Sequence, residues 1–358
     1  MKSLRFPGFF CVGSDIFQDF LSYASCYGKK FVFIGGKRSL GAARGELEKS
    51  FAGDDMCSCS FAECGGIATI AEIDRVSALA EVAEAEVVCA VGGGSCMDVA
   101  RTIANRSGRP LLMLPTTVAS DAPCSCVSVF YDEAGTSVVG DEVFYKCPDM
   151  VMVDSKVIAN APKRQIASGM ADALATYYEG ITCRNHPNGT GITETAMMIA
   201  GLCRDIVLRD GFAAYQSVEN HIVTPQLENV IEANCFLSGV GGANTGCAAA
   251  HGMGDYLCKI PGGHDFMHGE RVFVGLVVQM ILEQYPVEEI RTILRFGKRM
   301  GLPASLADLG VKDIEKTACS LAEGLQGDHF MANLCCDYSV NKLAGSILYA
   351  QCLADNLL

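Results

Sequence analysis

The sequence predicts an α/β domain, with a Rossmann-like parallel sheet and a β-hairpin, followed by an all-α domain. The first 160 residues alternate short apolar runs with helical segments, and near-continuous Val, Ile and Leu strands are typical of a parallel sheet covered on both faces. After Pro162, strand signals become rare and long helical segments continue to the C-terminus. A chain of 358 residues also exceeds the usual size of one core. We therefore predict one domain over residues 1–160, a second over residues 161–358, and a cleft between them.

The elements of the first domain follow from its apolar pattern. Residues 1–15 predict a first strand or a loop, and residues 126–140 alternate in polarity around Glu133-Ala134-Gly135, which predicts an antiparallel hairpin. The predicted strands of the sheet are residues 30–36, 57–64, 87–94, 109–117 and 150–162, the last including an exit loop. The predicted helices between them are residues 39–50, 68–86 and 96–106.

The second half predicts helices almost throughout. The clearest helical segments are residues 163–183, 190–208, 226–240, 266–285 and 287–300. We find no internal repeat and no low-complexity linker in the chain.

The composition excludes several classes of function. A net charge of -13 disfavours nucleic acid and anionic membranes as partners. We expect neither a transmembrane helix nor a signal peptide, because charged residues and glycines interrupt every apolar run. The 19 cysteines are scattered through apolar segments without the C-x-x-C spacing of a zinc knuckle. They predict reduced thiols used as small core residues, and hence a cytoplasmic protein.

A glycine-rich turn joins the strand of residues 87–94 to the helix that follows. Gly92, Gly93 and Gly94 would let the backbone approach a phosphate, and the helix N-terminus would supply free N–H groups. The turn matches neither G-x-G-x-x-G nor the P-loop, so an ordinary tight β–α turn remains an alternative. Asp98 follows in the first helical turn, where a carboxylate suits the helix dipole.

A second polar loop, "LPTTVASDAPCS" at residues 114–125, follows the next strand. Polar clusters at the carboxyl ends of parallel strands are where open α/β sheets bind ligands. Thr116, Thr117, Ser120 and Asp121 can also be simple turn-forming residues. The presence of two such loops on adjacent strands favours the functional interpretation.

All six histidines lie in the helical half, and three of them fall between residues 251 and 268. His251 lies in an apolar helix, and His264 and His268 are four residues apart, which would place them on one face of a helix. Asp172 lies near the start of another small-residue helix. One acid and two histidines suit a catalytic divalent metal with an open position, while satisfied core and surface histidines remain the alternative.

Four sequence blocks together resemble the glycerol dehydrogenases of the iron-containing alcohol dehydrogenase family, which have a dehydroquinate synthase-like architecture. The blocks are "GGGSCMD", "PTTVASDAPCSCVSVFYD", "SGMADALATYYE" and "IEANCFLSGVGGANTGCAAAHGMGDYL" with "HDFMHGERVFVGL". The resemblance implies a metal bound by Asp172, His251 and His268, commonly zinc and in some relatives iron. It also implies a homo-oligomer.

The resemblance further implies a dinucleotide site. The residues that would contact the cofactor are Gly92, Gly93, Gly94, Ser95, Cys96, Thr116, Thr117, Ser125, Val127 and Tyr131. Asp121 would face the substrate hydroxyls, and His264 would lie near the metal without binding it.

Two positions depart from the family pattern. Ser95 stands where the family usually has lysine, which removes a cation from the phosphate turn. The strand of residues 30–36 ends in Gly35-Gly36 and is followed by Lys37 and Arg38, without the acid that would hold the ribose of NAD. Two cations there favour acceptance of the 2′-phosphate of NADP, unless they are only a solvated helix start.

The sequence therefore predicts a metal-dependent NAD(P) oxidoreductase acting on a small polyol or vicinal diol, such as glycerol oxidised to dihydroxyacetone. Alternatives on the same fold are reduction of a 2-oxo acid, an α-hydroxyketone or a glycerol 1-phosphate-type substrate with NADP(H). A non-redox or binding member of the fold is a further alternative.

Overall fold

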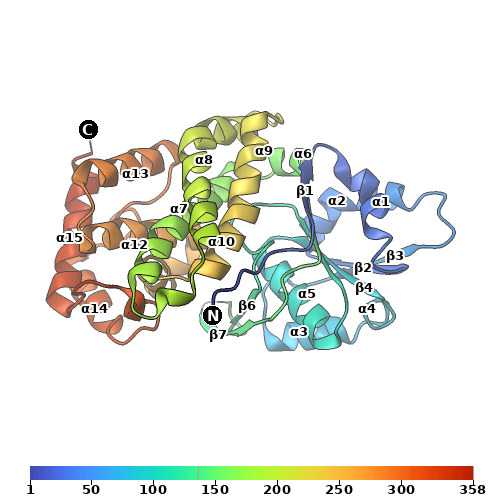
Figure 1. The fold of residues 1–358 in the computed structure, drawn as a ribbon, viewed down its shortest axis with the longest axis horizontal. Coiled ribbons are helices and arrows are strands. Elements are labelled where there is room, and N and C mark those ends of the chain that lie inside the picture. Colours follow the sequence, from blue (N-terminus) through green and yellow to red (C-terminus); the bar gives the residue numbers. More distant parts are fainter. Residues whose placement is uncertain (136, 358) are drawn as a thin grey trace.

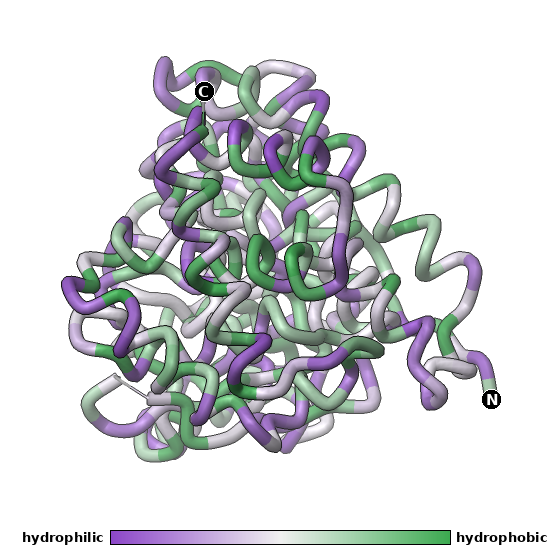
Figure 2. The backbone as a smooth tube through the Cα atoms, turned by 90° about the vertical axis from the view of Figure 1, so that its left-hand side faces the viewer, coloured by the Kyte–Doolittle hydropathy of each residue, from purple (hydrophilic) through white to green (hydrophobic). Residues whose placement is uncertain are grey.

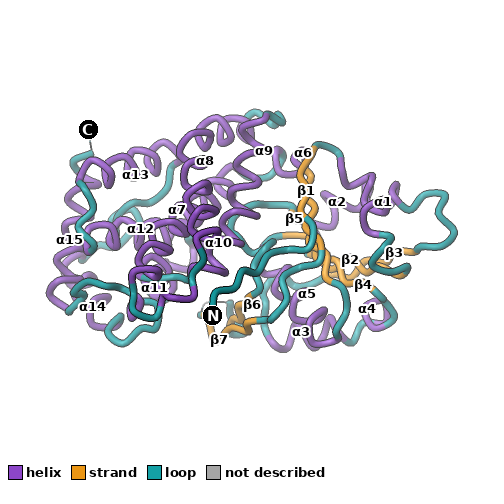
Figure 3. The backbone as a smooth tube through the Cα atoms, viewed as in Figure 1, coloured by secondary structure: helices purple, strands orange, loops and turns teal. Residues whose placement is uncertain are grey.

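The computed structural model describes residues 1–135 and 137–357, and it separates a strand-containing half from a helical half (Figures 1 and 3). A six-stranded sheet, in the order β1-β8-β5-β4-β2-β3, is parallel throughout. Its strands are β1 (Phe10–Gly13), β2 (Lys30–Gly35), β3 (Ser58–Glu63), β4 (Val87–Gly92), β5 (Leu111–Pro115) and β8 (Met150–Asp154). The predicted parallel sheet is confirmed, while the domain boundary near residue 160 stays a prediction.

Side chains alternate between the two faces of the sheet along each strand, and different helices cover the two faces. Phe31 and Phe33 of β2 pack with α1 (Phe20–Ala24) and α2 (Lys37–Ser50) in one apolar cluster. Val32 and Ile34 pack on the other face with α3 (Ile70–Ser77) and α5 (Gly94–Ser107). This second cluster continues without a break into the helical half, so the two halves share one core. Hydrophilic residues gather along the outer turns of the chain (Figure 2).

Two predicted segments of the first half differ from the structure. The predicted helix over residues 68–86 breaks into α3 and α4 (Ala80–Ala83), because Leu79 is extended and the turn brings Val82 into the core. The predicted exit loop after β8 instead forms the short helix α6 (Ser155–Ala159), because the Asp154 carboxylate caps its first N–H groups.

The predicted hairpin is confirmed as the antiparallel pair β6 (Val127–Tyr131) and β7 (Val138–Val143), which forms a separate two-stranded sheet. Thr136, inside the predicted hairpin, lies outside the described residues.

Helices make up most of the second half, as predicted (Figure 3). They are α7 (Lys163–Asn185), α8 (Glu194–Glu219), α9 (Pro225–Glu232), α10 (Ser238–Thr245), α11 (Ala249–Leu257), α12 (His268–Leu282), α13 (Val287–Met300), α14 (Ile314–Gly324) and α15 (Val340–Asp355). A π-helical segment, Ala233–Leu237, links α9 to α10 where the sequence predicted a continuous helix. Within the described residues, no helix combines the length and the apolar character that crossing a bilayer requires.

Helix α7 is the central helix of the second half and is buried on almost every side. It packs against α8, α10 and α12, and its start lies against the loop that follows β5. Gly169 makes this approach possible, because any Cβ at that position would overlap the Val118 carbonyl. The close contact places the first turns of α7 beside the end of the sheet.

Candidate active site

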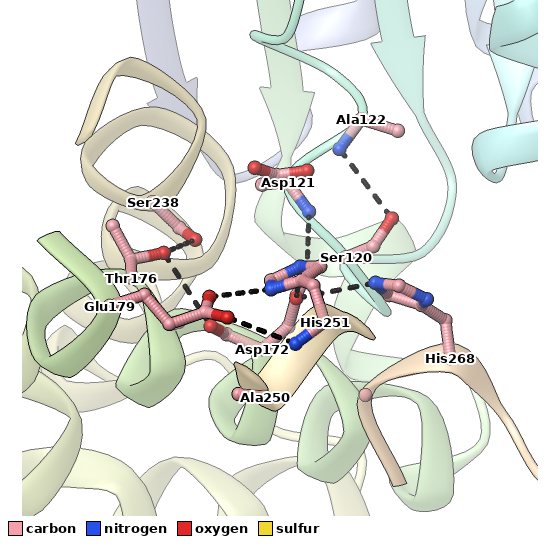
Figure 4. A network of polar contacts seen from close by, with 12 residues as sticks. Ser120, Asp121, Ala122, Asp172, Thr176, Glu179, Ser238, Ala250, His251 and His268 are labelled. Atoms are coloured by element: carbon pink, nitrogen blue, oxygen red, sulfur yellow. Dashed lines mark hydrogen bonds and ion pairs between the residues drawn. The ribbon is translucent and has the colours of Figure 1, made fainter. Parts of the chain in front are cut away.

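One acid and two histidines from three helices meet beside the carboxyl end of the sheet (Figure 4). Asp172 of α7 points its Oδ1 atom at His251 Nε2, 3.3 Å away, and at His268 Nε2, 3.5 Å away. His251 comes from α11 and His268 is the first residue of α12. The edge of a tetrahedron with metal–ligand bonds near 2.0–2.1 Å is roughly 3.4 Å. Two of the three donor separations match this edge, and all three donor atoms lie within 4.8 Å of one another, so the set could hold a divalent metal.

A second acid orients His251 from its other side. Glu179, one helical turn after Thr176 on α7, is fully buried and accepts the backbone N–H groups of Ala248 and His251 at 2.8 and 2.9 Å. Its Oε2 atom lies 2.6 Å from His251 Nδ1. Because a carboxylate only accepts, Nδ1 must donate to Glu179, and Nε2 is the ring nitrogen that faces Asp172. While protonated, Nε2 donates to Asp172, and once it has lost that proton its lone pair is available to a metal.

Glu179, Cys247 and His251 also lie close enough together to hold a metal. The two sets share His251, so they compete for its ring. The Glu179 oxygens already accept three hydrogen bonds, whereas Asp172 Oδ1 faces only imidazole nitrogens. We therefore assign the metal-type arrangement to Asp172, His251 and His268, with Glu179 as the carboxylate behind the histidine.

The electrostatics of this cluster favour a cation. Burial by itself raises the pKa of Asp172, yet hydrogen bonds from His251 and His268 outweigh it and hold that pKa well below its usual range. Burial lowers the pKa of His251, but Cys247, Glu179 and Asp172 reverse the shift and keep it well above the usual value. The same negative surroundings that retain a proton on the imidazole would stabilise a divalent metal in its place.

The loop after β5 connects this cluster to the sheet. The Asp121 N–H donates to Asp172 Oδ2 at 3.3 Å, which places Asp121 at the edge of the cluster (Figure 4). Burial and the neighbouring charge of Asp172 raise the pKa of Asp121 to about 7. The sequence placed Asp121 among candidate substrate contacts, and the structure brings it to the donor set.

Arg101, which the sequence did not single out, holds this loop in place. It is fully buried in α5, and its guanidinium donates to the carbonyls of Ala122 and Val127 and to Asp98 Oδ1. Asp98 is therefore stabilised by an ion pair with Arg101, and not by the helix dipole as its position in the sequence indicated. The available signal was an Asp–Arg pair three residues apart in the helix that follows the glycine turn.

The glycine turn lies next to the same loop. Strands β4 and β5 pair in parallel with Gly92 opposite Pro115, and the Thr116 N–H donates to the Gly92 carbonyl at 3.1 Å. Gly92 has φ +155°, and an added Cβ would lie 3.0 Å from that of Cys96. Gly93 is the N-cap of α5, so this 14-residue helix begins at the glycine turn.

The residues around this turn fit a phosphate-bearing ligand. Gly94 and Ser95 begin α5, and no acidic residue stands in its first turn. Thr117 Oγ1 is buried and finds no hydrogen-bond partner among the described residues. Free helix N–H groups and an unsatisfied hydroxyl are the donors that a dinucleotide pyrophosphate requires.

The remaining predicted cofactor residues lie around the same end of the sheet. Ser125 Oγ accepts the N–H of Val127 at 3.1 Å where β6 begins. Tyr131 ends β6, and burial raises its pKa to about 12. Lys37 is exposed at the first position of α2, directly after β2.

His264 does not share a helical face with His268. It lies in the 3₁₀ turn Gly263–Asp265, and α12 begins only at His268. The His264 side chain is 51% exposed, with Nε2 3.7 Å from Asp265 Oδ1. The prediction of a shared face was wrong because the turn interrupts the helix, and a role near the metal stays a prediction.

Comparisons with known proteins agree with this geometry. Residues 7–155 match the sequence model of the family described as iron-containing alcohol dehydrogenase. A glycerol dehydrogenase of Escherichia coli O6:H1 is 38% identical over 318 residues, which cover 87% of this chain and 86% of that protein. Among solved structures, a probable glycerol dehydrogenase from Sinorhizobium meliloti 1021 has a TM-score of 0.90 at 30% identity, covering 100% of both chains. Glycerol dehydrogenase from Schizosaccharomyces pombe has a TM-score of 0.93 at 26% identity, covering 100% of this chain and 92% of that chain. This chain therefore belongs to the iron-containing alcohol dehydrogenase family and is similar to its glycerol dehydrogenases.

Proposed function

We propose that this protein oxidises a small vicinal diol such as glycerol, with transfer of a hydride to NAD or NADP and with help from a bound divalent metal. The observation that carries the proposal is the contact between Asp172 and Asp121. It joins a three-ligand metal-type cluster to the loop that flanks the glycine turn. Metal, substrate and dinucleotide would then meet at one end of the sheet.

The residues of the chain have separate tasks in this proposal. Asp172, His251 and His268 would hold the metal, and Glu179 keeps the Nε2 lone pair of His251 turned toward it. A metal bound there polarises the alcohol oxygen and favours loss of its proton. Asp121 would accept a hydrogen bond from the neighbouring hydroxyl group and so orient the carbon that gives up hydride.

Gly92 to Cys96, with Thr116 and Thr117, would position the dinucleotide. The nicotinamide cofactor supplies the hydride acceptor. We propose zinc ahead of iron as the metal, because the two donor separations from Asp172, 3.3 and 3.5 Å, match the edge of the tetrahedron that zinc prefers.

A neutral diol suits the site better than a phosphorylated substrate. Arg271, which is buried, already donates to the carbonyls of Gly254, Gly263 and Phe266. Lys259 is exposed and lies over the Tyr256 ring. Neither side chain is free to bind a substrate phosphate, and Arg101 is committed to Asp98 and two backbone carbonyls, which disfavours a glycerol 1-phosphate-type substrate.

We also propose that NADP is accepted alongside NAD. Lys37 and Arg38 are both exposed at the N-terminus of α2, and the first turn of that helix has no acid. Cations at this helix end are unfavourable for the dipole, and a 2′-phosphate would compensate them. Replacing Lys37 with Ser should weaken use of NADP more than use of NAD. Lys30→Ser, at the opposite end of β2, is the matched control, and a strong NAD preference in the unaltered protein would contradict the idea.

The experiment that tests the function measures bound metal and NAD(P)H formation on the purified full chain. Glycerol and 1,2-propanediol should be oxidised, and 2-hydroxybutyrate should react far more slowly. A preference for 2-hydroxybutyrate would favour a hydroxycarboxylate substrate. A metal-free, inert preparation that still binds dinucleotide would instead favour the binding member of the fold. Size-exclusion chromatography with light scattering tests the expected homo-oligomer.

A further inference from the structure

Two cysteines are in direct contact beneath the glycine turn. The Sγ atoms of Cys64 and Cys96 are 3.2 Å apart, and the Cys64 thiol donates to Cys96. Both side chains are buried, with 3% and 7% of their surface exposed. Neither sulfur belongs to a disulfide among the described cysteines. The roughly 2.05 Å of a disulfide bond is about 1.2 Å shorter than this separation.

The pair links two turns that the dinucleotide site uses. Cys64 follows the last residue of β3, and Cys96 is the third residue of α5, just after the glycine turn. Gly36, between β2 and α2, also lies close by: an added Cβ there would be 3.8 Å from Cys96 Sγ and 4.0 Å from the Cys64 carbonyl. The sulfurs therefore lie between the proposed pyrophosphate turn and the proposed ribose end of the site.

The surroundings make the two sulfurs unequal. The hydrogen bond from Cys64 and a second from the Gly36 backbone lower the pKa of Cys96 despite its burial. The start of a helix also stabilises a thiolate. The hydrogen bond to Cys96, followed by burial, raises the pKa of Cys64 far above its usual value. Cys96 is thus the nucleophile of the pair, and Cys64 is the proton-bearing partner.

We propose that Cys64 and Cys96 form a reversible disulfide when a peroxide reaches the empty cofactor site, and that this bond weakens dinucleotide binding. The Cys96 thiolate attacks one peroxide oxygen, the O–O bond breaks, and hydroxide leaves and takes a proton, which forms a sulfenic acid and water. Cys64 sulfur then attacks the sulfenic sulfur, loses its proton and displaces a second water. With hydrogen peroxide, two thiols become one disulfide and two water molecules form. A dithiol reverses the reaction by exchange.

The bond affects binding because Cys96 packs against the turn itself. A Cβ at Gly92 would lie 3.0 Å from Cys96 Cβ and 3.1 Å from its Sγ, so the turn is closely packed against Cys96. Closing the sulfurs by about 1.2 Å pulls the first turn of α5 toward β3 and moves its free N–H groups. A bound dinucleotide would in turn cover the pair and protect it. The effect on binding rests on the proposed function, whereas formation of the bond does not.

The test compares the full chain before and after treatment with hydrogen peroxide. Mass spectrometry of an unreduced digest should find the Cys64 and Cys96 peptides joined and two hydrogens lighter. The dissociation constant for NADH, measured by fluorescence titration, should rise at least tenfold and return after dithiothreitol. The variant Cys64→Ser should bind NADH normally and lose the response to peroxide.

Cys147→Ser is the matched control. Its thiol is hydrogen-bonded to Cys126, and that bond lowers the pKa of Cys126 to about 6, so this second pair is the competing target of peroxide. The control variant should respond as the unaltered protein does. Absence of the joined peptide overturns the proposal, and so does a joined peptide without a change in affinity. If the reduced protein binds neither NADH nor NADPH, the proposed function fails while the mass measurement still decides whether the thiol pair reacts.

Discussion

Replacing Glu179 with Gln should disable the metal-type cluster without removing any of the three residues that form it. The two backbone N–H groups of Ala248 and His251 both donate to Glu179 Oε1, so the amide oxygen of Gln must occupy that position. The amide NH2 group then faces His251 Nδ1, which becomes an acceptor. A neutral imidazole must carry its proton on Nε2 instead, and that proton points at Asp172 and blocks the metal.

The size of the effect follows from the burial of the contact. Glu179 is fully buried, so no water can restore the lost acceptor. Loss of a carboxylate behind a metal-binding histidine typically lowers metal affinity or activity 10- to 100-fold, or about 1.4 to 2.7 kcal/mol. The fold should survive, because the amide keeps both backbone hydrogen bonds and nearly the same volume.

The assay is a zinc titration against a competing chelator, followed by rates of NAD(P)H formation with 1,2-propanediol at saturating zinc. Zinc affinity should fall by the stated factor, and part of the rate should return at high zinc. Glu228→Gln makes the same chemical change at a carboxylate that accepts a hydrogen bond from Ser155, and it should leave both quantities unchanged. Zinc affinity within twofold of the unaltered protein for Glu179→Gln would refute the argument from the histidine tautomer.

Three further outcomes are expected. Asp172→Asn should lose bound metal and activity together, as measured by metal analysis and diol oxidation, and a variant with full metal and full rate excludes the assignment. Gly92→Ala should lower the free energy of unfolding by about 1–3 kcal/mol, seen as a lower thermal midpoint, because Gly92 has φ +155° and an added Cβ would press on Cys96. Gly94→Ala should change the midpoint little, because no neighbouring atom lies nearer than 3.6 Å to the position of its Cβ. Burial raises the pKa of Glu283 from 4.5 to about 7. Between these pH values the folded protein holds a proton that the unfolded chain has released, so the free energy of unfolding falls as pH rises from 4.5 to 7. Glu283→Gln should therefore raise the free energy of unfolding by roughly 1–2 kcal/mol at pH 8, after allowance for solvent screening, and should leave it unchanged at pH 4. An equal gain at both pH values in calorimetry would contradict the raised pKa.

Much of the fold was predictable because it depends on local pattern. Continuous Val and Ile runs predict buried parallel strands, and the structure confirms the sheet and the hairpin. The ends of helices and strands were harder to predict, because they depend on single contacts. The Asp154 cap that starts α6 and the turn that buries Val82 have no strong signal in a hydrophobic pattern.

The residues of the candidate site were likewise predictable only in part. Asp172, His251 and His268 were predicted from residue type and family resemblance, and the structure brings them together. Glu179 was missed because a glutamate in a helix looks like a solvated residue until its burial is known.

The order of strands and helices, the glycine turn and the types of donor available to a metal could all be predicted from the sequence. These features follow from the spacing of apolar residues and from side-chain chemistry, both of which are local. Three contacts became visible only in the folded chain: Glu179 sets the proton of His251, Arg101 holds the loop of Asp121, and Cys64 touches Cys96. Each of those contacts joins segments at least 21 residues apart in the chain. Their partners are chosen by the packing of buried polar groups against one another, which no local pattern records.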